Sequence, residues 1–183
     1  MTGRNSTPTL PNLFPLRLSL ALSLFLLLAG AGACDPHDED LETPAATEVV
    51  ERYDYHGSLD AEMSGNVAQV TVGVDPAEIE RGGPLWAKAL PYLFLFSEAT
   101  WTLFQEYDGL AGVRVEARDP GGVLISGALL ERNTLGSAEW PEVLEMSAEA
   151  MAEGTEHPAR MQDLVNRGED RTSFEYNPDY TSE

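Results

Sequence analysis

Alternating apolar and polar positions predict a β-hairpin over 58–74. Two runs show this alternation, which is typical of strands that bury one face. They are separated by Ser64, Gly65 and Asn66, three residues that favour a turn. The apolar positions are Leu59, Ala61 and Met63 in the first run, and Ala68, Val70, Val72 and Val74 in the second.

The period then changes to that of helices. Asp75 and Glu78 flank Pro76 as in a capping box, and Gly82 with Gly83 ends this short helical turn. The predicted main helix covers 91–107. Pro91 either opens this helix or kinks a longer one that begins near Pro84. Its apolar stripe has spacings of three and four, at Leu93, Phe96, Ala99, Leu103 and Tyr107.

A second hairpin is predicted from strands 113–118 and 123–130, joined by the turn 119–122. Its register stays open. Val115 facing Ile125 buries the best apolar face, whereas a tight turn shifts the pairing by one residue. Two helices follow, over 140–153 and 158–167. The first is predicted to turn Val143, Leu144, Ser147, Ala150 and Met151 inward, with Gly154 as its cap.

The element order β-β-α-β-β-α-α predicts an α+β fold. In this fold two hairpins form a mainly antiparallel four-stranded sheet, and the helices pack on one face. Residues 53–167 are expected to form the single domain. The polar residues 168–183 are predicted to be a disordered tail. Residues 34–52 contain seven acidic residues and two prolines, which favours an acidic flexible tether.

The first 34 residues have the layout of a secretory signal. Arg4 and Arg17 precede the apolar run 18–33, and no acidic residue occurs before Asp35. The run is 16 residues long, shorter than the roughly 20 residues that a transmembrane helix needs. It ends in three small residues, and Cys34, the single cysteine of the chain, follows directly.

This arrangement resembles the lipobox of bacterial lipoprotein precursors. The resemblance covers residues 1–34 only, and Ala31 stands where the family pattern usually has leucine. It implies that the signal peptide 1–33 is removed and that Cys34 is lipidated. The acyl chains on Cys34 would then anchor an exported protein to a bacterial membrane, inner or outer being undecided. A plain signal peptide cut at the same site is the alternative.

Charge narrows the classes of partner. The chain has 11 Lys+Arg and 31 Asp+Glu, a formal charge of −20. Loss of Arg4 and Arg17 with the signal leaves −22, which repels phosphates and anionic headgroups. Nucleic acid is therefore excluded as an expected partner. The single lysine, Lys88, and the dense carboxylates are also typical of adaptation to salt, which we treat as a hypothesis.

No catalytic motif is present. The sequence lacks a P-loop and the G-x-G-x-x-G, H-E-x-x-H, C-x-x-C and G-x-S-x-G patterns. His56, between Asp54 and Asp60, is the candidate for a base, but an exposed strand edge is the simpler interpretation. His157 is interpreted as a loop residue, and the acidic residues around His37 as a solvated tether, with weak calcium binding as the alternative. No metal site and no cofactor are predicted.

Aromatic residues indicate a surface for a partner. Trp86 and the aromatic residues of the main helix, among them Tyr92 and Phe94, are candidates for a groove that binds an apolar ligand or a peptide, although core packing is the ordinary interpretation. The main helix carries more aromatic surface than one sheet face needs, so its N-terminal half is a candidate contact surface for a partner or a second copy. The sequence thus favours a lipid-anchored, non-enzymatic binding or envelope-structural module, with another envelope protein as a possible partner. The alternative is a small exported hydrolase or metal-dependent enzyme that uses His56 with nearby carboxylates.

Overall fold

The computed structural model describes residues 41–154 and 156–182. These lie in one compact unit, Glu39–Glu183, which contains both clusters of buried hydrophobic residues that the structure describes. A unit with its own core has what independent folding requires. The predicted signal peptide and Cys34 lie outside the described residues.

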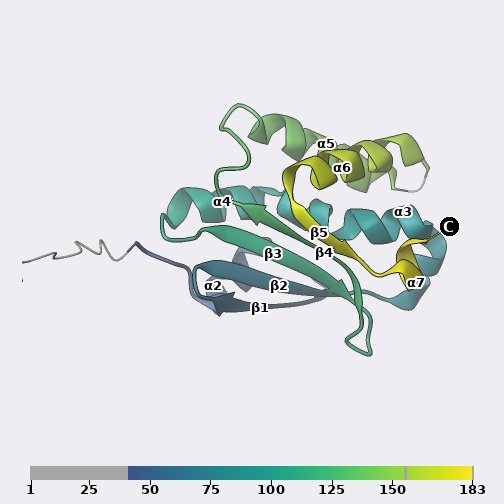
Figure 1. Cartoon of the computed structure of the whole chain (residues 1–183), viewed down its shortest axis with the longest axis horizontal. Coiled ribbons are helices and arrows are strands. Elements are labelled where there is room, and N and C mark those ends of the chain that lie inside the picture. The colour runs from purple at the N-terminus through teal and green to yellow at the C-terminus, as the bar shows by residue number, and fades with distance from the viewer. Residues whose placement is uncertain (1–40, 155, 183) are drawn as a thin grey trace, which may run out of the picture. The chain divides into compact units, whose positions relative to one another are not determined.

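A five-stranded mixed sheet forms one layer of this unit (Figure 1). The strands follow one another in chain order across the sheet. Neighbouring strands are antiparallel except β2 and β3, which are parallel. The strands are β1 (Ser58–Ser64), β2 (Val67–Gly73), β3 (Gly112–Arg118), β4 (Leu124–Glu131) and β5 (Ser173–Tyr176).

The α+β class is confirmed, but the prediction of four strands is wrong. The hairpin over 58–74 is present, with Ala61 opposite Val70. Neither predicted register of the second hairpin is correct, because Val115 pairs with Ala128. The register shifts between Ala117 and Arg118, and Arg118 pairs with Leu124, so the loop 119–123 is longer than a tight turn.

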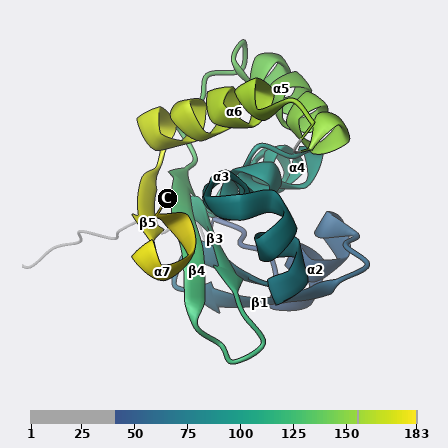
Figure 2. The same ribbon diagram turned by 90° about the vertical axis from the view of Figure 1, so that its right-hand side faces the viewer.

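The helices cover one face of the sheet in two layers (Figure 2). α3 lies against β3 and β4, and α6 packs on α3 and on α5. Within the described part of the chain, no helix is both long and apolar enough to span a bilayer. The helices are α2 (Ala46–Tyr53), α3 (Pro76–Leu95), α4 (Glu98–Glu106), α5 (Trp140–Glu153), α6 (Pro158–Arg171) and α7 (Pro178–Thr181).

The predicted single helix over 91–107 is wrong, because the chain breaks between α3 and α4. Ser97 is extended there, and its hydroxyl oxygen accepts a hydrogen bond from the Thr100 amide, which caps α4. The same hydroxyl donates to the Phe94 carbonyl at 2.5 Å. The Pro91 alternative of a longer, kinked helix is closer: α3 runs through Pro91, and the backbone turns at Gly83, whose φ is 68°.

The predicted tether is also too long, because α2 occupies its last part. Val49 is fully buried, and the Tyr53 hydroxyl hydrogen-bonds to Thr100 Oγ1 at 2.7 Å. Before α2, the carbonyl of Glu42 accepts from the Gly109 amide at 2.9 Å. The domain therefore begins well before residue 53. The acidic residues of the predicted tether include the short amphipathic helix α2.

The prediction of a disordered tail over 168–183 is wrong as well. α6 continues to Arg171, and β5 then pairs with β4, with Ser126 opposite Tyr176. The Tyr180 hydroxyl of α7 donates to Asp119 Oδ2 at 2.8 Å. These contacts are with residues far away in the sequence, so the polar composition of the segment gave no sign of them.

Candidate binding groove

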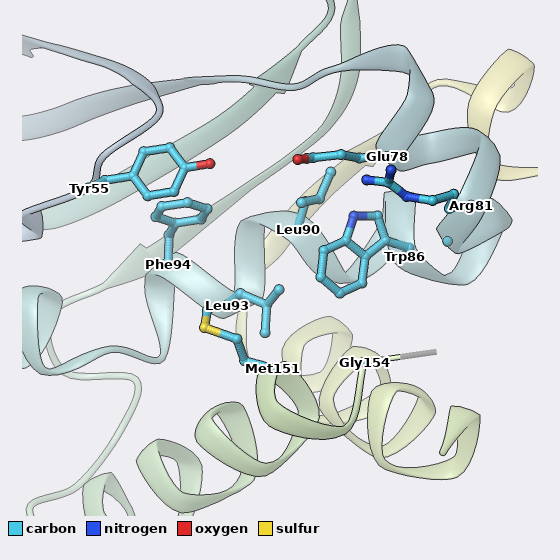
Figure 3. Close-up of a pocket in the computed structure, with 10 residues that line it drawn as sticks. Tyr55, Glu78, Arg81, Trp86, Leu90, Leu93, Phe94, Met151 and Gly154 are labelled. Atoms are coloured by element: carbon cyan, nitrogen blue, oxygen red, sulfur yellow. The ribbon is translucent and has the colours of Figure 1, made fainter. Parts of the chain in front are cut away.

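One face of α3 lines an open cavity of about 440 Å³ against α5 (Figure 3). Four side chains share this face of the helix, because successive members are four, three and one residue apart. They are Trp86, Leu90, Leu93 and Phe94. Met151 closes the cavity from α5, and Tyr55 from the connection between α2 and β1. We call this site the apolar groove.

The apolar groove exposes large hydrophobic side chains to solvent. Tyr55 is 43% exposed and Met151 is 56% exposed, so the prediction that Met151 faces inward is wrong. The Tyr55 ring meets Phe94 edge-on, with the ring centroids 5.2 Å apart and the planes at 85°. Large exposed hydrophobic side chains in a concave site are typical of surfaces that bind a partner or a ligand.

Charged residues occupy one side of the groove. Glu78 and Arg81 come from the first turns of α3 and stand near the indole of Trp86 (Figure 3). Partial burial, followed by the negative charge of Glu78, raises the pKa of the Tyr55 hydroxyl above its ordinary value. Tyr55 therefore stays a neutral donor and acceptor at physiological pH.

The indole N–H of Trp86 is a donor that no described residue accepts. Its Nε1 is buried and has no acceptor among the described residues. The position of the indole depends on Gly82, because a Cβ there would lie 2.4 Å from Cβ and Cγ of Trp86. A second cavity of about 330 Å³ shares Arg81, Gly82, Trp86 and Gly154 with the first, so Trp86 stands between the two.

The structure separates the three aromatic residues proposed from the sequence. Trp86 and Phe94 line the groove, but Tyr92 is fully buried on another face of α3. Its hydroxyl hydrogen-bonds to the Tyr176 hydroxyl at 2.7 Å, and burial raises the pKa of Tyr92 to about 12. Sequence reasoning missed Tyr55, Met151, Glu78 and Arg81, of which Tyr55 alone carried a signal, as an aromatic residue at the start of the domain.

The candidate catalytic residues do not converge. His56 is exposed between α2 and β1, outside the groove. His157 is exposed beside Glu153, with 3.5 Å between Nδ1 and Oε2. In the described ranges, no group of three or more His, Cys, Asp or Glu residues is placed to hold a metal ion. His37 and the acidic residues around it lie outside these ranges.

No family model, no curated protein and no solved structure matches the chain.

Proposed function

We propose that the chain is an exported, lipid-anchored, non-enzymatic binding module and that the apolar groove is its binding site. The observation that carries the proposal is the concentration of exposed apolar side chains in a concave site, with Tyr55 and Met151 at its edges. A cavity of about 440 Å³ falls within the range of roughly 300–1,000 Å³ that ligand sites occupy.

The proposed lipid on Cys34 agrees with the role of a binding module at a membrane. It would hold the domain at the membrane surface. Two or three acyl chains give stable anchoring, whereas one chain does not. The test is the intact mass of the protein from its native host, beside Cys34→Ala. A chain that begins at Cys34 and carries two or three acyl chains, and that is released from membranes by the substitution, supports the anchor. An unacylated soluble chain contradicts it.

Binding in the groove is tested with the neutral apolar dye Nile red and a matched pair of variants. Tyr55→Ser removes an aromatic ring from the groove, whereas Phe174→Ser removes an equally exposed ring, 46% against 43%, outside it. We expect Nile red fluorescence to fall with Tyr55→Ser and with Met151→Glu, and to stay with Phe174→Ser. Equal effects of the two serine variants would contradict the groove as the binding site.

A further inference from the structure

Two donors of the apolar groove have no acceptor among the described residues, and they lie on the same side of it. Trp86 Nε1 is buried and unpaired among the described residues. Arg81 is exposed and forms no ion pair with a described residue, unlike the five arginines that pair with glutamates. A buried donor without a partner costs stability, so an acceptor that reaches it stabilises the bound state.

The groove therefore has its charged groups at one end and the aromatic rings of Tyr55 and Phe94 at the other. Figure 3 shows Arg81 and the indole nitrogen of Trp86 on one side, and Tyr55 and Phe94 on the other. Leu90, Leu93 and Met151 lie between and below them. A ligand that matches this order has a head group with oxygen acceptors, which meets Arg81 and Trp86, and an apolar tail, which meets Leu93, Phe94 and Met151.

Charge restricts the head group further. A guanidinium favours a carboxylate, which accepts two parallel N–H bonds. Glu78 beside Arg81 and a chain of net charge −20 disfavour heads with more than one negative charge. A cationic head would be repelled by Arg81 but attracted by Glu78, so the test below includes a cationic ligand. Because Arg81 and Trp86 Nε1 have no acceptor among the described residues, the arrangement fits a monoanion with an apolar chain.

We infer that the apolar groove binds the free carboxylic acid of a medium-length acyl chain, with the carboxylate at Arg81 and Trp86 and the chain along Leu93, Phe94 and Met151. This inference rests on the proposed function of the groove and specifies its ligand. It assigns Arg81 to head-group recognition and Trp86 to both the head and the first methylenes.

The test compares three ligands with the same ten-carbon chain and different heads: decanoate, decanol and decyltrimethylammonium. They are titrated calorimetrically, below their micelle concentrations, into residues 39–183. We expect decanoate to bind most tightly. Octanoate should bind more weakly than decanoate, by up to about fourfold for each methylene removed, because each buried methylene adds to the affinity.

Variants separate the head from the chain. Arg81→Gln should weaken decanoate about tenfold, the effect of one charge-assisted hydrogen bond, and leave decanol unchanged within about twofold. Arg114→Gln, on the face of the sheet that carries no described helix, is the matched control and should change neither. Trp86→Phe keeps the apolar surface and removes the donor, so it should weaken decanoate and decanol together.

The outcomes distinguish this inference from the function beneath it. Equal binding of decanol and decanoate, or tighter binding of the cationic ligand, contradicts the inferred carboxylate head group. The proposal that the groove is a binding site is not affected by that result. The same holds when Nile red binds in a Tyr55-dependent manner and none of the three ligands does. When none of the three ligands binds and Nile red fluorescence is also unchanged by Tyr55→Ser, both the inference and the proposed function are contradicted.

Discussion

At the scale of single residues, glycines set how closely the helices pack. Gly168 of α6 lies against the ring of Tyr92 on α3, so that a Cβ at this position would stand 2.3 Å from Cδ1 of Tyr92. Both residues are buried. The contact between α3 and α6 therefore needs a residue without a side chain here, as close helix packing in a dense core requires.

Gly168→Ala is expected to destabilise the domain by about 1–3 kcal/mol, the usual cost of overpacking a core. The alanine gains about 1 kcal/mol in helix propensity, which offsets only part of the cost. Urea unfolding should show a lower midpoint with an unchanged slope. Gly136→Ala is the control, because its nearest atom is 3.5 Å away, an ordinary contact. Equal stability of the two variants would contradict the packing argument.

Asp119 links the loop between β3 and β4 to α7 in a pH-dependent way. The hydrogen bonds from Tyr180 and from the Val123 amide lower the pKa of Asp119 below its ordinary value. A lowered folded pKa means that the contribution of the carboxylate is present above about pH 3.9, its ordinary pKa. It is lost as the pH falls through the folded pKa.

We expect the ring signals of Tyr180 in NMR spectra to shift as the pH falls below about 4, when the carboxyl becomes protonated. Asp119→Asn should abolish this shift, because the amide does not titrate. The signals of Tyr53, which hydrogen-bonds to Thr100 instead, serve as the internal control. A shift of Tyr180 that persists in Asp119→Asn would assign the titration to another group.

At the scale of elements, Ser97 divides a continuous apolar stretch into α3 and α4. Ser97→Ala should destabilise the domain by about 0.5–2 kcal/mol, because the first turn of α4 loses its cap. The substitution also removes the hydrogen bond to the Phe94 carbonyl. Ser97→Thr keeps the hydroxyl and should restore most of the stability. Thermal unfolding measures both, and an unaffected Ser97→Ala would show that the break is set by packing alone.

Local pattern was enough to predict some of these elements. The hairpin over 58–74 and the helix Trp140–Glu153 with Gly154 as its cap both follow from periodicity and turn residues. The break at Ser97 did not follow, because the apolar spacing continues across it. β5 was missed because this edge strand is held by main-chain hydrogen bonds to β4. Such bonds do not require apolar side chains, so a polar sequence can form the strand.

The groove was predictable only in part for a related reason. Trp86 and Phe94 stand on the same face of α3, while Tyr92 points to α6 and Gly168. The spacing of apolar residues along one helix does not identify the face that packs against the core, because that depends on the elements around the helix. Tyr55 and Met151 join the site from other elements, and this convergence is a property of the tertiary fold.

At the scale of the whole molecule, acidic residues outnumber Lys and Arg by 31 to 11. Five arginines pair with glutamates in the described ranges, and these pairs lie at the surface. Arg132 instead donates to the carbonyls of Leu110, Phe104 and Tyr107 around the end of α4. Most carboxylates of the described residues therefore have no basic partner in an ion pair and repel one another.

We expect the melting temperature to rise as NaCl increases from about 10 mM to about 1 M, because the Debye length falls from about 30 Å to about 3 Å. The rise should be smaller near pH 4, because acid lowers the net negative charge that salt would otherwise screen. That measurement is the control for effects of salt other than screening. A melting temperature that does not rise would also exclude the hypothesis of adaptation to salt.

The order of strands in the sheet has a consequence for folding kinetics. The two hairpins join neighbours in the chain, but Val67 of β2 must find Gly112 of β3, and Leu129 of β4 must find Ser173 of β5. Contacts between distant residues form slowly, since long loops must close first. The hairpins should therefore appear early, and the edge of β4 stays open to other chains until β5, near the C-terminal end, has docked.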